Sequence, residues 1–558
     1  MIELQIDEVI YNAGILGLCR VLQHANLHFK PNGQTISFDE ANLENFTEHY
    51  FELLTERYGY ESSYHKMLAS KAFIEKCMVG VDDEKQLEQF NTLIDNMKRW
   101  LTSNSYKNVY PFLKDIPYQF EAEAKAWKKV NKKKKETVDD VRQQITEMAT
   151  QLLKCITFLE QPSAKRYIVP RVLSYQIIQG FWSNVSLLNS TASKKDLYEE
   201  YENYFIKSAS AYLEAKKDEK KYAKNKLACA CCDNRMKTAA EAFDLTWVQK
   251  VGVDAARKSS HYWDHQRDIF ICPICNIVYS CVPLGFTLAK GKGLFINNNR
   301  SIDELISVNS ISLRDGKNEL LQDELESIAY FKILDVMVQQ AENHKDLEID
   351  NIQIVKYDRN MESRPYTFNV LSREKAKQMQ DSKQDFQFLV GKFAKENGEY
   401  LQIYQEVVKR LYNGQSFADL LYRLLRLVVD GEFKGIASIN RILNISNNQF
   451  KGGTHYMTQE ELKKVRSYGF HLKEAYRGQE SKLNGITYRL LNALKVKNSN
   501  KFMETLIQAY SYKKLAIPAS FVQVLNDVEK FQTIGYAFLI GLHGFEKTKD
   551  NKEEQANG

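Results

Sequence analysis

Apolar and polar residues alternate with two different periods in the first part of the chain. Residues Ile2–Ile10 are mostly apolar and lead through Asn12–Gly17 into a further apolar stretch, which predicts a strand or short helix, a glycine turn and a helix. Pro31-Asn32-Gly33 predicts a turn before the alternating Thr35–Phe38, and Phe46–Leu54 has helical spacing. The N-terminal part is therefore expected to be mixed α+β.

Helical spacing dominates further along the chain. Tyr167–Leu188, which includes Trp182, is apolar enough for a core helix. From about residue 391, one predicted helix has Ser416 as a plausible N-cap and Gly431 at its end. The apolar face of that helix consists of Phe417, Leu420, Leu421, Leu424 and Val428.

Further helices follow in the same region. Thr458 and Glu461 have the spacing of a capping box, and Phe521–Leu542 predicts a last long apolar helix. Another apolar stripe is formed by Leu483, Ile486, Leu490 and Leu494. The fold class expected is α+β and predominantly helical, with an inserted zinc-ribbon-like four-cysteine site and a C-terminal α-helical bundle.

These patterns divide the chain into five segments. We expect a mixed α+β domain over residues 1–226, a zinc-binding insertion over 227–285, a continuation of the α+β domain over 286–390, a basic helical bundle over 391–545 and a disordered tail over 546–558.

One uncharged stretch, Ile269–Ala289, is about long enough to cross a bilayer. It contains several cysteines and prolines, so a metal knuckle followed by a buried strand is favoured over a membrane span. The N-terminus carries acidic residues where a secretory signal has basic ones. These features together favour a cytoplasmic protein that does not contact membranes.

Charge is distributed unevenly. The whole chain has a net charge of +6, whereas residues 401–545 alone contain 20 Lys plus Arg against 11 Asp plus Glu. The basic character therefore lies toward the C-terminus, where a polyanion can bind.

Two pairs of cysteines are the strongest chemical signal. Cys229 and Cys232 are followed after 39 residues by Cys272 and Cys275, and two such pairs complete a closed, tetrahedral zinc site with no position left for water. A structural Zn²⁺ is therefore expected, although buried apolar cysteines are the alternative. Cys231 or Cys281 can also replace one of the four ligands in this interpretation.

Two histidines lie between the cysteine pairs. His261 and His265 are four residues apart, which places both rings on one helix face and would suit a metal-dependent nuclease. The chain has no HExxH motif and no third ligand nearby, so ordinary surface or half-buried histidines are favoured.

The segment Gly291–Arg300 combines glycines, a lysine and three asparagines. Its backbone and the side chains of Lys292, Asn297, Asn298 and Asn299 suit contacts to phosphate or to base edges. The alternative is a hairpin turn and an Asx turn that lead into a helix capped by Ser301 and Glu304. It is not a nucleotide-binding Walker loop, because the glycine spacing is wrong and Gly293 replaces the Ser or Thr.

Lysine-rich stretches also suit phosphate binding. They occupy residues 125–135 and 216–226, and solvated side chains are the alternative for both. In the bundle, basic residues alternate with Tyr468 and Tyr476. Outside Gly291–Arg300, the candidate nucleic-acid contacts are Lys128, Lys129, Lys132, Lys463, Lys464, Arg466, Lys473 and Arg477.

The order of these segments resembles the CRISPR-associated CXXC-CXXC family. The resemblance covers nearly the whole chain and rests on Asn12–Gly17, the paired cysteines, the GKGLFINNN segment and Gly535–Gly541. It implies a non-catalytic large subunit of the type I-B surveillance complex, Cascade. Such a subunit binds the guide-RNA handle and double-stranded target DNA, helps to recognise the target-flanking motif and recruits a separate helicase-nuclease in antiviral defence.

The resemblance also implies that other Cascade backbone subunits are partners and that the C-terminal bundle is similar to the small subunit of the complex. No motif-reading residue is carried over, because no family motif fixes its position. The alternatives are a zinc-stabilised nuclease, or another nucleic-acid-processing enzyme, and a protein-interaction module whose basic bundle binds an acidic partner.

Overall fold

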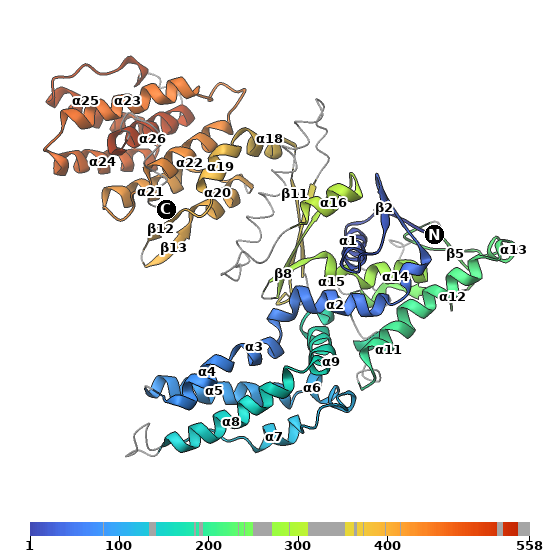
Figure 1. The fold of residues 1–558 in the computed structure, drawn as a ribbon. Helices are drawn as coiled ribbons and strands as arrows, with labels where there is room; N and C mark the ends of the chain where they lie inside the picture. The colour runs from blue at the N-terminus through green and yellow to red at the C-terminus, as the bar shows by residue number, and fades with distance from the viewer. Residues whose placement is uncertain are drawn as a thin grey trace. The chain divides into compact units, whose positions relative to one another are not determined.

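The computed structural model describes residues 1–558 except 82, 133–140, 183–185, 189–193, 233, 239, 249–269, 290, 311–351, 362–364, 372, 397, 413, 522–527 and 545–558. The described residues are mostly helical, with small sheets, so the expected α+β, predominantly helical class is confirmed (Figure 1). They form two compact units, the first within residues 1–322 and 352–370 and the second from Leu371 onward. Among them, no helix is both long enough and apolar enough to cross a bilayer.

The first unit contains two larger sheets and many helices. Its strands are β1 Ile2–Gln5, β2 Phe29–Asn32, β3 Thr35–Phe38, β4 Leu227–Ala228, β5 Arg235–Met236, β6 Phe243–Asp244, β7 Phe270–Ile271, β8 Thr287–Ala289, β9 Lys292–Asn297, β10 Ile352–Asp358 and β11 Tyr366–Leu371. Strands β1, β3 and β2 form an antiparallel three-stranded sheet, and a second sheet has the order β11-β10-β9-β8. The turn expected at Pro31–Gly33 joins β2 to β3, with Gly33 at a φ of 58°.

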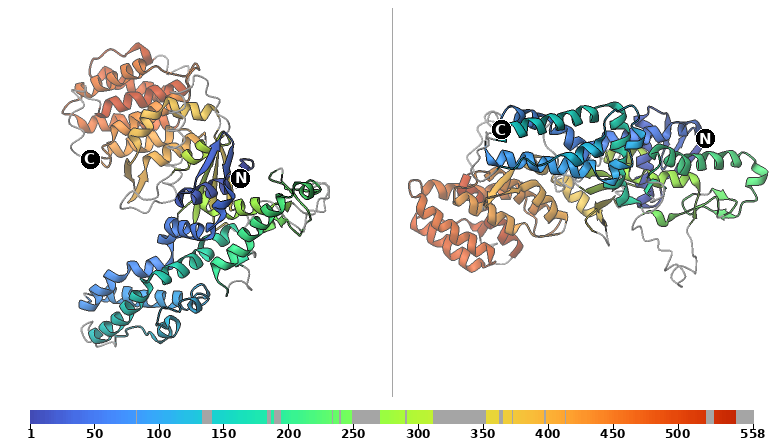
Figure 2. Two further views of the ribbon diagram at one scale, coloured as in Figure 1. Left: turned by 45° about the vertical axis from the view of Figure 1, so that its right-hand side comes forward. Right: turned by 90° about the horizontal axis from the view of Figure 1, so that it is seen from below.

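The helices of this unit are α1 Val9–His24, α2 Phe46–Tyr58, α3 Ser63–Ala69, α4 Lys71–Val79, α5 Glu84–Leu101, α6 Asn104–Lys107, α7 Phe120–Ala126, α8 Arg142–Leu159, α9 Pro162–Leu173, α10 Gln179–Phe181, α11 Leu197–Tyr201, α12 Lys207–Lys216, α13 Glu219–Tyr222, α14 Pro273–Ser280, α15 Val282–Gly285 and α16 Ile302–Val308. Helix α4 packs on α8, and α5 packs on α7 (Figures 1 and 2). The predicted core helix over Tyr167–Leu188 is divided, since a π-helical turn at Ser174–Ile178 separates α9 from α10.

Helix α1 includes Asn12–Gly17, where a glycine turn was expected, so that prediction is wrong. Gly14 and Gly17 do not form a turn but lie inside the helix, where α1 crosses α14 and α15. A Cβ at Gly14 would lie 2.4 Å from the carbonyl oxygen of Val278, and one at Gly17 would lie 2.0 Å from that of Cys281. Glycine is therefore required because backbones touch, which is a contact between segments more than 260 residues apart that local sequence does not reveal.

The structure of the segment after the second cysteine pair also differs from the prediction. It forms the helices α14 and α15, where a buried strand was expected. Cys272 is the N-cap of α14 and Pro273 occupies the first helical turn, where proline costs no hydrogen bond. The uniformly apolar sequence suits a helix buried on all sides as well as it suits a strand, so periodicity alone could not distinguish them.

Side chains of α1 and α2 satisfy the carbonyl groups at the end of α15. Arg20 donates from Nη1 to the carbonyls of Leu284 at 2.6 Å and Gly285 at 2.7 Å, and Tyr58 donates to that of Phe286 at 2.6 Å. The last carbonyls of a helix have no partners within the helix, so these bonds fasten the end of α15 to the core. Burial lowers the pKa of Arg20 to about 9.

The second unit is a helical bundle that contains one β-hairpin. Its described elements are α18 Arg373–Asp381, α19 Lys383–Leu389, β12 Phe393–Glu396, β13 Glu399–Gln402, α20 Ile403–Tyr412, α21 Ala418–Val429, α22 Ile436–Asn448, α23 Gln459–Ala475, α24 Glu480–Lys495, α25 Ser499–Tyr512 and α26 Val528–Gly544. The capping box at Thr458 and Glu461 is present, and the four predicted stripe residues of α24 are buried. The N-cap of α21 is Phe417 instead of Ser416, although Ser416 accepts a bond from the Ala418 amide.

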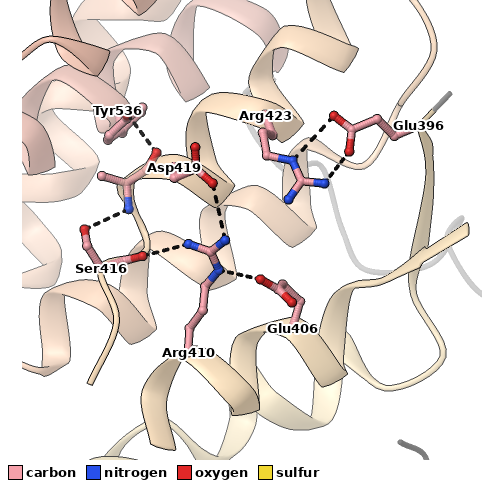
Figure 3. A network of polar contacts seen from close by, with 8 residues as sticks. Glu396, Glu406, Arg410, Ser416, Asp419, Arg423 and Tyr536 are labelled. Carbon is pink, nitrogen blue, oxygen red and sulfur yellow. Dashed lines mark hydrogen bonds and ion pairs between the residues drawn. The ribbon is translucent and has the colours of Figure 1, made fainter. Parts of the chain in front are cut away.

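Ion pairs tie the hairpin and α20 to the bundle. Arg423 of α21 pairs with Glu396 of β12, and Arg410 of α20 contacts Glu406 at 2.7 Å and Asp419 at 3.3 Å (Figure 3). Tyr536 of α26 donates to the Ala418 carbonyl at 2.9 Å.

The boundaries of the second unit differ from the predicted ones. The unit includes α18 and α19, which precede residue 391, where the sequence placed the start of the bundle. The described part of the last predicted helix is α26, Val528–Gly544, whereas residues 522–527 and the tail expected over 546–558 lie outside the described residues.

Candidate metal centre

Two short backbone turns bring the four paired cysteines together. Cys229 and Cys232 lie in the turn that joins β4 to β5, where the Cys229 amide donates to the Asn234 carbonyl at 2.9 Å. Cys272 and Cys275 lie at the start of α14, and the Cys275 amide donates to the Cys272 sulfur at 3.5 Å. One pair therefore comes from a turn between strands and the other from a helix N-terminus, whose partial positive charge favours thiolates.

The sulfur atoms have the spacing of a metal-binding tetrahedron. All four lie within 4.8 Å of one another, and Cys232 Sγ is 3.7 Å from Cys272 Sγ and 3.5 Å from Cys275 Sγ. A tetrahedral ion with Zn–S bonds of about 2.3 Å requires sulfurs about 3.8 Å apart, whereas a disulfide requires about 2.0 Å. The four thiols can thus hold a metal ion, and all nine cysteines of the chain are free.

The pKa values show what the cluster requires. Hydrogen bonds from Cys231 and Cys232 place the pKa of Cys229 well below its usual range. The bonds that Cys272 and Cys275 make to Cys229 raise the pKa of both. A second or third thiolate so close to the first is unfavourable without a neutralising cation, and a bound divalent ion supplies that charge.

Neighbouring donors stabilise the sulfur atoms. The hydroxyl of Tyr11 in α1 lies 3.3 Å from Cys275 Sγ, the Asn234 amide donates to Cys232 Sγ at 3.3 Å, and the Cys272 backbone amide donates to Cys229 Sγ at 3.2 Å. Such bonds orient ligands and spread their negative charge. The cluster is therefore connected directly to α1.

The two further cysteines named as alternative ligands lie in different places. Cys231 is half-buried, its sulfur is 3.5 Å from the Tyr279 hydroxyl, and the hydrogen bond with Cys229 raises its pKa to about 12. Cys281 is buried at the C-terminus of α14, next to Gly17 of α1. The group that can hold a metal consists of Cys229, Cys232, Cys272 and Cys275 and includes neither residue.

The asparagine segment after β9 is joined to α1 by side-chain amides. Asn297 and Asn298 are buried, and Asn12 donates to Asn297 Oδ1 at 2.9 Å and to Asn299 Oδ1 at 2.6 Å. Asn298 donates to Glu304 at 3.0 Å and accepts from the Arg300 amide at 3.1 Å, which is an Asx turn. The alternative weighed from the sequence, a hairpin followed by an Asx turn, is thus present, and of the three asparagines only Asn299 is exposed.

The Ser301 cap on α16 is also present, since the Glu304 amide donates to Ser301 Oγ. Sequence reasoning did not find the role of Asn12, which joins the N-terminus to this loop. Its side chain accepts from the Asp7 amide at 2.7 Å and donates to the Asp7 carbonyl at 3.2 Å, as a neighbouring strand would. An asparagine inside an apolar helix was the available signal, because a buried amide needs partners.

The lysine candidates of the N-terminal unit are engaged in ion pairs to different extents. Lys128 is exposed, Lys129 pairs with Asp95 at 2.6 Å, and Lys132 pairs with Glu84. Lys292 lies 3.8 Å from Asp358. Lys133–Lys135 and the histidines His261 and His265 lie outside the described residues.

The candidate nucleic-acid contacts in the bundle differ in how far their side chains are buried. Lys463, Lys464 and Arg477 are exposed and Lys473 is half-buried. Arg466 is buried, donates to Asn440 at 2.9 Å, and has a pKa lowered by that burial. It lies where α23 crosses α26, and a Cβ at Gly541 would be 1.9 Å from its carbonyl oxygen.

The cysteine segment is also the part of the chain that matches a known family. A family model described as CRISPR-associated protein (Cas_CXXC_CXXC) matches residues 222–287, which contain all four clustered cysteines. The match supports the CRISPR-associated CXXC-CXXC family for this chain, as the resemblance implied. No curated protein and no solved structure matches the chain.

Proposed function

We propose that this chain is the non-catalytic large subunit of a type I-B Cascade complex and that its four cysteines hold one structural Zn²⁺. The observation that carries the proposal is the coincidence of the family match over residues 222–287 with a closed cluster of four thiols. Four thiolates favour zinc among common divalent ions and fill every position of a tetrahedral site. Such a site leaves no position for a reactive water, so the metal stabilises the fold.

In this proposal the subunit binds the guide-RNA handle and double-stranded target DNA, helps to recognise the flanking motif and recruits the helicase-nuclease. Base pairing with the guide selects the target sequence, while protein contacts to the nucleic-acid backbone and flanking motif support opening of the duplex. The excess of basic residues in 401–545 supports the backbone contacts.

Co-purification tests the proposal. The tagged full chain is isolated at low salt from cells that express the CRISPR locus of its source, and bound RNA and proteins are identified by sequencing and mass spectrometry. We expect repeat-derived RNA together with other backbone subunits. An isolated chain that lacks both, or that cuts DNA alone with Mg²⁺ and stops cutting after His261→Ala, contradicts the proposal and favours a nuclease.

A further inference from the structure

A surface pocket in the second unit combines aromatic and basic side chains. It has a volume of about 410 Å³ and lies between the end of α23 and the neighbouring helices α24 and α25. It is lined by Tyr476, Lys482, Gly485, Ile486, Arg489, Gln508, Ala509 and Tyr512. Of these residues, the sequence patterns drew attention only to Tyr476 and to Ile486.

The two tyrosines form the aromatic part of the pocket. Their rings are stacked, with centroids 6.1 Å apart and an interplanar angle of 25°. Tyr476 is buried and fixed by a hydrogen bond from its hydroxyl to the Ala509 carbonyl at 2.9 Å. Tyr512, in contrast, is 58% exposed. A rigid buried ring thus supports an exposed one. Lys482 Nζ lies over the exposed ring, 4.6 Å from its centroid, and a flat group that stacks there would take its place.

Three cations near these rings donate to neutral groups. Lys482 donates to the Tyr512 hydroxyl at 2.7 Å, Lys513 to Gln479 at 3.2 Å, and Arg489 to Gln508 at 3.5 Å. No carboxylate of the described residues lies within ion-pair distance of any of the three. The nearby carboxylates are engaged elsewhere, since Glu504 pairs with Lys501 at 3.1 Å and Glu480 accepts from the Gly478 amide.

Several other cations of the same unit are paired with carboxylates. Arg441 pairs with Asp385 at 3.0 Å and Lys451 with Asp381 at 2.7 Å, as do the arginines of Figure 3 with their carboxylates. The pocket therefore has a local excess of positive charge beside an exposed aromatic ring. That combination matches the phosphate and the base of a nucleotide.

Gly485 is a separate observation that indicates a ligand. It lies in the interior of α24, where glycine destabilises a helix relative to alanine. A Cβ added there would meet no atom within 4 Å, so packing does not require glycine. Gly485 lines the pocket, so its missing side chain leaves that part of the pocket wall open.

We infer that this pocket binds single-stranded nucleic acid by stacking one base on Tyr512 while Lys482, Arg489 and Lys513 contact the flanking phosphates. The inference rests on the proposed function, because it names the form of nucleic acid that the second unit holds. A duplex does not fit the same geometry, since its bases are already stacked on one another and cannot reach the tyrosine.

Fluorescence anisotropy of the full chain with a labelled oligothymidylate tests this inference. A probe of about 20 nucleotides exceeds the site size of single-strand-binding domains. We expect Tyr512→Ala to weaken binding about tenfold, since a base–aromatic stack is lost, and Tyr512→Phe to preserve most of it. Gly485→Leu fills the pocket without changing charge and is expected to weaken binding to a similar extent.

Tyr400→Ala is the matched control, because Tyr400 is 64% exposed on β13 and lies outside the pocket. Circular dichroism confirms that each variant is folded. Unchanged affinity of both Tyr512→Ala and Gly485→Leu overturns the inference. Displacement of the probe by polyglutamate as readily as by unlabelled oligothymidylate also overturns it and indicates an acidic peptide as the ligand.

The two proposals fail in different ways. If guide RNA and subunits co-purify but the pocket variants bind the probe normally, the inference is wrong and the proposed function stands. If the pocket variants lose probe binding but no RNA or subunit co-purifies, the pocket is a nucleic-acid site in a protein of another function.

Discussion

The cysteine cluster of the first unit and the tyrosine pocket of the second each lie beside a glycine-containing helix, but the glycines have opposite roles. At Gly17 of α1 an added Cβ would lie 2.0 Å from the carbonyl of Cys281, whereas at Gly485 of α24 it would meet nothing. The polar groups differ in the same way, because thiols of the cluster bond to one another while the cations of the pocket have only neutral partners. The groups of the cysteine cluster thus contact one another, whereas those of the tyrosine pocket are left available for the proposed ligand.

Replacing one of the four clustered cysteines should destabilise the chain more than any other substitution proposed. Cys272→Ser removes a proposed zinc ligand that is also the N-cap of α14, and a structural zinc contributes on the order of 10 kcal/mol to folding. We expect loss of soluble protein, or of bound metal in any that remains. Elemental analysis of the unaltered chain should find one zinc per chain, and its absence would remove the zinc assignment.

Cys231→Ser is the matched control for this experiment. Cys231 lies next to the cluster but outside the group of four, so the variant should keep its metal and its stability. Retention of zinc by Cys272→Ser together with its loss from Cys231→Ser would show that the ligand set is different.

The next largest effect tests the helix crossing. Gly17→Ala would raise the intrinsic helix propensity of α1, yet the added methyl group collides with the carbonyl of Cys281, between α14 and α15. We expect the free energy of unfolding of the first unit to fall by about 2–3 kcal/mol, because over-packing a backbone contact cannot be relieved by rotating a side chain. Urea denaturation monitored by tryptophan fluorescence measures it, and a stability equal to that of the unaltered chain would mean that the helices do not touch.

Local patterns predicted the parts of the fold whose causes are local. The turn at Gly33, the capping box at Thr458 and the stripe of α24 depend on residues within about one or two helical turns. The cysteine pairs also belong to this class, because the spacing within each pair fixes its turn. That the two pairs meet followed from chemistry, since each pair supplies only half of a tetrahedral site.

The remaining features depend on contacts between distant segments. Gly14 and Gly17 look like a turn unless the backbone of α14 is known to lie against them, and Arg466 looks like a surface cation until α26 covers it. The tyrosine pocket also depends on a tertiary contact. Lys482 and Arg489 belong to α24 and Tyr512 to α25, so they form a group only because these helices pack together. Charge counting located the basic region but could not separate paired cations from free ones.

Replacing Gly485 by alanine tests the difference between the two glycines directly, because it adds the same methyl group as at Gly17 in a place where no atom lies within 4 Å. Gly485→Ala should raise the free energy of unfolding of the second unit by about 0.5–1 kcal/mol, since the methyl group meets no neighbour and alanine favours the helix. Calorimetry of the full chain measures this as a higher Tm for that unit, alongside anisotropy with the oligothymidylate. Greater stability with weaker binding identifies a glycine kept for its ligand. Lower stability would mean that α24 needs this glycine for its own packing, and the two glycines would then have the same role.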